Sequence, residues 1–227
     1  MGKIVLFHGS PQVVPAPSLE KGKATNDYGR GFYCTKSAEM AKEWACKSGT
    51  NGFINEYEWD DDDLKILNLL EKPYTAMHWI AILLKNRTFS LQHPIARTAR
   101  DYIIANFGIE RGDCDAIIGY RADDSYFSFA QSFVENSLPF GALKRALLLG
   151  ELGEQTALVS EKAFDRLRFI QSELVDKTLY YPKFKSRDEN ARAKYINEIK
   201  NAPFVPDDVF VMDILRQEMK SDDPRLQ

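Results

Sequence analysis

The strongest constraint on the fold is a set of short apolar runs at irregular intervals along the chain. Each run is too short for a buried helix, and several carry β-branched or aromatic residues, so the runs predict strands. The expected strands cover residues 4–7, 32–35, 53–59, 116–120, 155–159 and 166–169. Stretches of helical character cover residues 38–47, 64–70, 74–85, 95–106, 125–133, 138–149, 188–200 and 207–220. Because strands and helices do not alternate strictly, as they do in βαβ units, the sequence predicts an α+β domain.

Local signals refine three of these helices. Ser37 is well placed to cap the helix at 38–47. The acidic run at 60–63 precedes the apolar periodicity of 64–70, so we interpret it as favourable charge at a helix N-terminus, with a cation site as the alternative. His78 lies between Met77 and Trp79 and is interpreted as a packed histidine rather than a metal ligand.

The charge balance excludes broad classes of partner. Lys and Arg number 30 against 33 Asp and Glu, which leaves a net charge of -3. No field of one sign is therefore expected to attract phosphate backbones or anionic lipid. With 44% hydrophobic and 28% charged residues, the composition is typical of a folded chain that buries a core and not of a disordered one.

Cysteine usage and hydropathy give an expectation for the compartment. The three cysteines are an odd number without a CxxC pair, so neither a disulfide framework nor a zinc site is predicted. No apolar run is long enough for a signal peptide or a membrane span. A cytoplasmic location with no membrane contact is the expectation, and secretion by a route that needs no signal stays open.

Composition divides the chain near residue 170. From Gln171 onward the sequence becomes highly charged, so we predict one domain over 1–170 and a helical C-terminal extension over 171–227. Pro203 and Pro206 could form a hinge before the last helix. That helix carries an apolar stripe that packs on its own domain or docks a partner, formed by Val209, Phe210, Met212, Ile214 and Leu215.

Four sequence blocks in a fixed order resemble a known superfamily. They read LFHGS, then DYGRGFYCTKSAEMAKEWA, GYRADDSYF and finally EQTALVSEKAFDRLRF. Together they look like the ADP-ribosyltransferase superfamily of the diphtheria-toxin and poly(ADP-ribose) polymerase type. More closely, they resemble a bacterial domain of unknown function, DUF3990, placed in that superfamily. The resemblance covers approximately residues 4–170 and implies a split β-sheet core with helical insertions.

The resemblance also implies an NAD site, in which NAD is a substrate and no metal takes part. His8 would hold the NAD ribose, and the backbone of Gly9 would grip the nicotinamide amide. Tyr33 and Trp44 would enclose the nicotinamide ring, where stacking on a cation contributes roughly 1 to 2 kcal/mol. The alternatives are a core histidine at a strand end and two ordinary core aromatics. Further NAD contacts are expected from Ser10, Arg30 and Gly31, with a solvated turn residue as the alternative for Arg30.

The sequence departs from the superfamily pattern at Gln155, which stands where the transferases have a catalytic glutamate. An amide can hydrogen-bond a ribose hydroxyl but supplies no charge to a developing oxocarbenium ion. Gln155 would then only position ribose, or Glu154, Asp123 or Asp124 would supply a carboxylate, or the chain would bind NAD without turnover. Glu154 is disfavoured because adjacent strand residues face opposite ways. Asp123 and Asp124 could instead cap the helix that follows.

The leading hypothesis is an NAD-dependent mono-ADP-ribosyltransferase with Tyr33, Gln155, Asp123 and Asp124 as candidate catalytic residues. Its acceptor would be a macromolecule, a protein rather than nucleic acid. The resemblance makes a bacterial toxin or effector plausible, with an antitoxin or regulatory protein as a further partner. The alternatives are an NAD glycohydrolase and a catalytically weak module that binds NAD or ADP-ribose.

Overall fold

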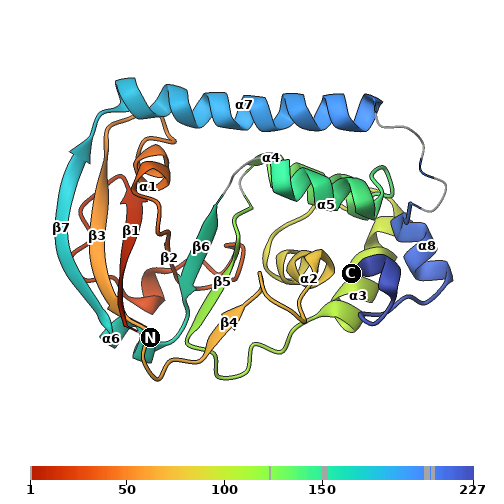
Figure 1. Ribbon diagram of the computed structural model, residues 1–227, viewed down its shortest axis with the longest axis horizontal. Coiled ribbons are helices and arrows are strands. Elements are labelled where there is room, and N and C mark those ends of the chain that lie inside the picture. The colour runs from red at the N-terminus through yellow and green to blue at the C-terminus, as the bar shows by residue number, and fades with distance from the viewer. Residues whose placement is uncertain (1, 123, 150–152, 202–204, 206–207) are drawn as a thin grey trace. The chain divides into compact units, whose positions relative to one another are not determined.

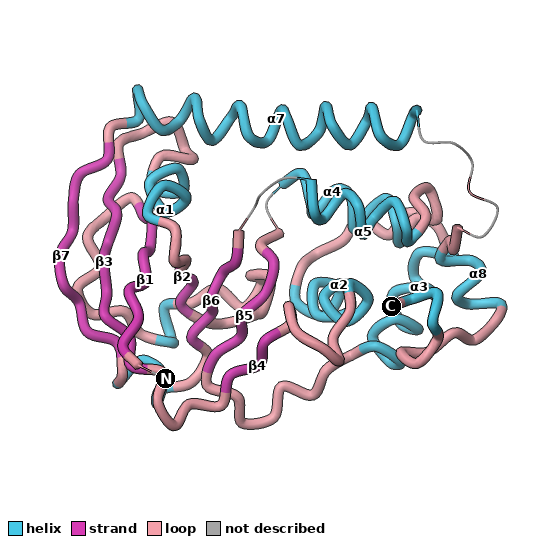
Figure 2. The backbone as a smooth tube through the Cα atoms, in the orientation of Figure 1, coloured by secondary structure: helices cyan, strands magenta, loops and turns pink. Residues whose placement is uncertain are grey.

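The computed structural model describes residues 2–122, 124–149, 153–201, 205 and 208–227. Within these ranges the chain forms eight α-helices and seven strands, and the strands make two sheets (Figures 1 and 2). The chain divides into two compact units, each assembled from three segments. The mixture of helices and strands predicted from the sequence is confirmed.

The first unit contains both sheets and comprises Met1–Asn68, Arg111–Tyr120 and Leu152–Arg187. One sheet is antiparallel, with strand order β1-β3-β7, and consists of β1 (Lys3–Ser10), β3 (Gly52–Asp60) and β7 (Leu167–Val175). The other has the order β2-β6-β5-β4 and consists of β2 (Phe32–Cys34), β6 (Glu154–Leu158), β5 (Ala116–Tyr120) and β4 (Ile66–Asn68). In this second sheet only β4 and β5 pair in parallel.

The two sheets meet where β1 passes the end of β2. Phe7 and Thr35 exchange two backbone hydrogen bonds there, of 2.8 and 2.9 Å. One apolar cluster holds side chains from both sheets and from α6 (Glu161–Asp165), namely Leu6, Phe32, Cys34, Tyr57, Trp59, Ala116, Leu158 and Ala163. Through this packing, residues of β1, β2 and β6 lie close together in the first unit.

Helix α1 (Ala38–Ala45) packs on the backbone of β1. Its N-terminus is capped as expected, because the Ser37 hydroxyl accepts a 3.3 Å hydrogen bond from the Met40 amide. A Cβ atom added to Gly9 would lie 1.9 Å from the Ala41 carbonyl oxygen and 2.7 Å from the Ala45 nitrogen. Glycine at position 9 therefore allows the helix to approach the strand.

The second unit is helical and comprises Leu69–Glu110, Arg121–Glu151 and Asp188–Gln227. Its helices are α2 (Ala76–Asn86), α3 (Pro94–Phe107), α4 (Asp124–Val134), α5 (Phe140–Leu149) and α8 (Val211–Arg216). The long helix α7 (Lys177–Asn201) contributes its first eleven residues to the first unit and the others to the second. Among the described residues, no helix is sufficiently long and apolar to cross a membrane.

Two sequence interpretations concern residues of the second unit. His78 is a packed histidine, because its Nδ1 accepts a 3.0 Å hydrogen bond from the Thr75 amide and its ring meets Phe107 edge-on. In the apolar stripe of the last helix, Val209 and Ile214 are buried. These two residues therefore pack on the protein itself.

Other expectations are corrected by the structure. The helix predicted over 64–70 is wrong, because residues 66–68 form β4, which pairs with β5. The helix expected over 188–200 begins already at Lys177, and the last helix runs over Val211–Arg216 rather than 207–220. Residue 170, where we expect the domain boundary, lies within β7, and the division into a domain and an extension stays a prediction. The proposed hinge at Pro203 and Pro206 lies outside the described residues.

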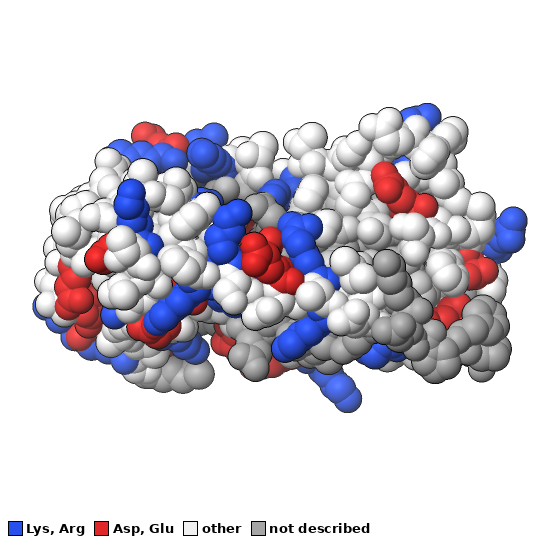
Figure 3. Space-filling model, turned by 90° about the horizontal axis from the view of Figure 1, so that it is seen from above, with Lys and Arg blue, Asp and Glu red and all other residues white. Residues whose placement is uncertain are grey.

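Charge on the visible surface agrees with the balanced composition. Figure 3 shows basic and acidic side chains interspersed on one face, without a broad region of one sign.

Candidate functional site

His8 lies near the end of β1 and is hydrogen-bonded to β2. Its Nδ1 is 2.7 Å from the Tyr33 carbonyl oxygen, and its ring centroid is 4.4 Å from that of Phe32. A carbonyl oxygen only accepts hydrogen bonds, so Nδ1 carries the proton. Desolvation lowers the pKa of His8 below its usual 6.5, more than the bond to Tyr33 raises it. The neutral ring therefore presents Nε2 as an acceptor, and no described residue is hydrogen-bonded to that atom.

The Tyr33 side chain holds the turn that precedes β2. Its hydroxyl donates to the Gly29 carbonyl over 2.6 Å and accepts from the Tyr28 amide over 3.0 Å. The rings of Tyr28 and Tyr33 are nearly parallel, 8° apart, with centroids separated by 6.4 Å. Tyr33 therefore links His8, through its carbonyl, to the turn at 26–31, through its hydroxyl.

Gln155 lies on β6, and its amide is fixed by two acceptors. Nε2 donates to the Asp27 carboxylate over 3.0 Å and to the Tyr120 carbonyl over 3.2 Å. The same Tyr120 carbonyl accepts from the Tyr28 hydroxyl over 2.5 Å. Gln155 and Asp27 are only 3% and 6% exposed. Among the described residues, none donates to the Gln155 Oε1 atom, so this oxygen can accept a hydrogen bond from a ligand.

These contacts form one connected group, which we call the His8–Gln155 network. It consists of His8, Asp27, Tyr28, Gly29, Tyr33, Tyr120 and Gln155. All of them belong to the first unit. Arg111 lies in the segment before β5 and supports the network by donating a hydrogen bond to the Tyr28 carbonyl over 2.9 Å.

The alternative carboxylates have different placements. Glu154 is exposed while Gln155 is buried, which confirms that these neighbours face opposite ways. Asp123 lies outside the described residues. Asp124 is the first residue of α4 in the second unit, and its side chain lies outside the described part of the chain.

The other predicted NAD contacts have structural neighbours of their own. The Ser10 hydroxyl donates to the Gln12 carbonyl and accepts from Asn55 over 3.1 Å. The Arg30 guanidinium donates to the Glu20 carbonyl over 3.0 Å on the exposed surface. Trp44 lies half-buried on α1. Roles in NAD binding for these residues, and for Gly9 and Gly31, stay predictions.

Sequence reasoning missed Asp27, the residue that pairs with Gln155. It precedes Tyr28 and Gly29 in a turn-rich stretch that is 128 positions away from Gln155. Asn55 was also missed: it is fully buried on β3, donates to Ser10 and accepts from the Val14 amide over 2.8 Å. A single polar residue amid strand alternation was the available signal for Asn55. No local signal connected Asp27 with Gln155.

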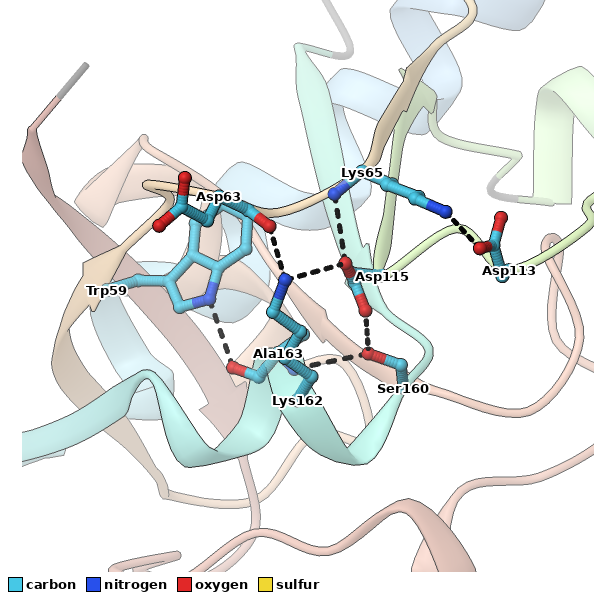
Figure 4. Close-up of polar contacts among 8 residues, drawn as sticks. All are labelled: Trp59, Asp63, Lys65, Asp113, Asp115, Ser160, Lys162 and Ala163. Carbon is cyan, nitrogen blue, oxygen red and sulfur yellow. Dashed lines mark hydrogen bonds and ion pairs between the residues drawn. The ribbon is translucent and has the colours of Figure 1, made fainter.

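A second polar cluster, around Asp115, joins β4, β5 and α6 (Figure 4). The buried Asp115 carboxylate accepts from the Ser160 hydroxyl over 2.5 Å and from the Lys65 amide over 2.9 Å. The Lys162 ammonium lies 3.9 Å away. Burial would raise the pKa of Asp115, but Ser160, Lys65 and Lys162 together hold it below its usual value. Because Ser160 also caps α6, this cluster is structural.

We expect Asp115→Ala to lower the free energy of unfolding by about 2 to 3 kcal/mol, because it removes charge-assisted hydrogen bonds inside the fold. The matched control is Asp113→Ala, which removes an exposed carboxylate paired with Lys65 and should change stability little. Denaturant unfolding of both variants tests this. Equal losses in the two variants would contradict a structural role specific to Asp115.

The depressed pKa of His8 predicts a pH-dependent contribution to stability. A histidine whose pKa is lower in the fold than in the unfolded chain binds fewer protons when folded, so acidification below about 6.5 favours unfolding. His8→Asn removes the titrating group. The free energy of unfolding of the wild type relative to this variant should be highest near pH 8 and fall below pH 6.5, measured by denaturant unfolding across pH. A constant difference across pH would rule out a depressed pKa.

Comparison with family models gives a match to most of the chain. The model of a family described as "Protein of unknown function (DUF3990)" matches residues 4–169. No curated protein and no solved structure matches the chain. The matched span contains every member of the His8–Gln155 network.

Proposed function

The chain belongs to the DUF3990 family, whose function is unknown, and from this premise we propose that it is an NAD-dependent mono-ADP-ribosyltransferase. The two sheets of the first unit would form the split core of an ADP-ribosyltransferase-like domain. NAD is the substrate, and ADP-ribose passes to a macromolecular acceptor, a protein rather than nucleic acid. Among the described residues, no group of three or more His, Cys, Asp or Glu is placed to hold a metal ion.

One observation carries the proposal. The three residues expected to contact NAD ribose and nicotinamide, His8, Tyr33 and Gln155, come from β1, β2 and β6 and share the His8–Gln155 network. Two acceptor atoms of this network, His8 Nε2 and Gln155 Oε1, are not paired with any described residue. Hydroxyl groups donate readily to such atoms, so a ribose with its 2′ and 3′ hydroxyls suits them.

The reaction proceeds by loss of nicotinamide from the ribose. The bond between ribose C1′ and the pyridinium nitrogen breaks, and its electron pair leaves with neutral nicotinamide. The acceptor nucleophile then bonds to C1′ and loses its proton. His8 and Gln155 orient the ribose through its hydroxyls, while Tyr33 and Trp44 stack on the nicotinamide ring. The positive charge that develops on the ribose is stabilised by the oxygen of Gln155.

The neutral amide at 155 supports a second candidate, a module that binds NAD or ADP-ribose with little turnover. An uncharged oxygen stabilises an oxocarbenium ion less than a carboxylate does. Transfer to water, which makes the protein an NAD glycohydrolase, is the remaining variant of the same chemistry. A toxin or effector role, with an antitoxin or regulatory partner, belongs to the transferase proposal.

An experiment with adenine-labelled NAD separates these candidates. Purified protein is incubated with labelled NAD and a cell extract, and label is measured in macromolecules and in free ADP-ribose. Label in macromolecules that survives denaturing washes supports the transferase. Label only in free ADP-ribose indicates a glycohydrolase, and unconverted NAD with measurable binding indicates a binding module.

A further inference from the structure

The structure places a buried carboxylate directly behind Gln155, on the opposite side of its amide from the unpaired oxygen. Asp27 accepts a 3.0 Å hydrogen bond from Nε2, and Oε1 is the other end of the same planar amide. Both groups are almost fully buried, so their interaction is weakly screened by solvent. The Gln155 amide therefore binds the Asp27 carboxylate through its nitrogen and presents its oxygen, Oε1, as an acceptor on the other side.

We propose that Asp27 is the positioning residue that supplies the negative charge missing at position 155. This inference rests on the proposed function. A carboxylate bonded to the N–H of an amide polarises it and increases the negative charge on the carbonyl oxygen. Gln155 Oε1 then stabilises the developing positive charge on ribose more strongly than an isolated glutamine does.

The surrounding contacts fix the geometry of this pair. The Tyr120 carbonyl is the second acceptor for Nε2, so the amide cannot rotate its oxygen towards Asp27 without placing oxygen against oxygen. The Tyr28 hydroxyl holds that carbonyl in turn. The pair is therefore preorganised, with the nitrogen towards Asp27 and the oxygen away from it.

The carboxylate next to Gln155 in sequence, Glu154, does not offer this arrangement. The Glu154 side chain is exposed, and the pleat directs it away from the Gln155 side chain. Asp27 comes from the turn before β2, and it is the carboxylate to which Gln155 donates.

The test exchanges the two groups. Asp27→Asn removes the charge with almost no change of shape. The double variant Asp27→Asn/Gln155→Glu again has one carboxylate and one amide in the pair, with the amide at position 27 and the carboxylate at position 155. The rates of nicotinamide release and the KM for NAD are measured for wild type and both variants, together with thermal unfolding. Glu154→Gln, which removes the exposed neighbouring carboxylate, is the matched control.

We expect Asp27→Asn to lower kcat about 30-fold with less than about a threefold change in KM, because the charge acts mainly in the transition state. The double variant should recover to within about fivefold of the wild type, and Glu154→Gln should retain wild-type kinetics. A fall in kcat with KM and the thermal unfolding temperature unchanged would not follow from a purely structural role of Asp27. If Asp27→Asn fails to fold, the kinetics of the double variant decide the question.

Failure of the inference differs from failure of the proposed function. Wild-type release that Asp27→Asn leaves within twofold overturns the inference alone, as does a folded double variant no faster than Asp27→Asn. Absence of release by the wild type with acceptors present overturns the enzymatic proposal and this inference together.

Discussion

His8→Asn is expected to slow nicotinamide release from NAD about 100-fold, the scale of losing one preorganised contact to the reacting group. The Asn amide nitrogen can replace His8 Nδ1 as the donor to the Tyr33 carbonyl, which preserves the link between β1 and β2. No atom of Asn replaces the Nε2 acceptor. The loss should therefore appear in activity rather than in folding.

Two controls isolate the role of Nε2. The far-ultraviolet circular dichroism spectrum of His8→Asn should match that of the wild type, which shows that the fold is retained. His78→Asn alters the packed histidine of the second unit and should leave kcat unchanged where the variant folds. Wild-type kinetics in folded His8→Asn would mean that Nε2 does not contact the substrate.

Gly9→Ala is expected to lower the free energy of unfolding by about 3 kcal/mol, at the upper end of the range for overpacked sites. The new methyl group would lie 1.9 Å from the Ala41 carbonyl oxygen and 2.7 Å from the Ala45 nitrogen. Both of these atoms belong to the backbone of α1. No change of rotamer can relieve this overlap, so the helix must move away from β1. Because α1 carries Trp44, we also expect weaker NAD binding by the variant.

Gly2→Ala provides the control for Gly9→Ala. A Cβ atom at Gly2 would have no heavy atom within 4 Å, so the variant should be as stable as the wild type. Denaturant unfolding of the two variants measures the difference. A Gly9→Ala protein as stable as Gly2→Ala would contradict the close packing of α1 on β1.

Elements with a clear periodicity or a clear cap could be predicted from the sequence. The strand before His8, the helix that Ser37 caps and the helix that starts beside Thr75 are all observed near their expected positions. The stretch 64–70 satisfies a helical spacing through its apolar residues at 64, 66, 67, 69 and 70, although only Ile66–Asn68 forms a short strand. Only the long-range pairing with β5 selects the strand, and that pairing has no local signal.

The candidate site was predictable only in part, for the same reason. Motif resemblance identified His8, Tyr33 and Gln155, and hydrogen bonds link all three in the structure. Asp27 could not be predicted because its partner is distant in sequence, and the sequence itself points only to a carboxylate next to Gln155 and to two carboxylates after β5. The fold brings a turn to the strand, and this supplies a carboxylate that sequence proximity could not indicate.

We expect the His8–Gln155 network to hold NAD for cleavage of its nicotinamide bond. The most direct measurement is nicotinamide release from NAD by the purified protein with a cell extract present, compared with Tyr33→Ala and Gln155→Ala. We predict release by the wild type and a loss of at least about tenfold in each variant, since each loses a stacking or hydrogen-bonding contact with the substrate. No release by the wild type, together with no NAD binding by calorimetry, would show that the His8–Gln155 network does not bind NAD.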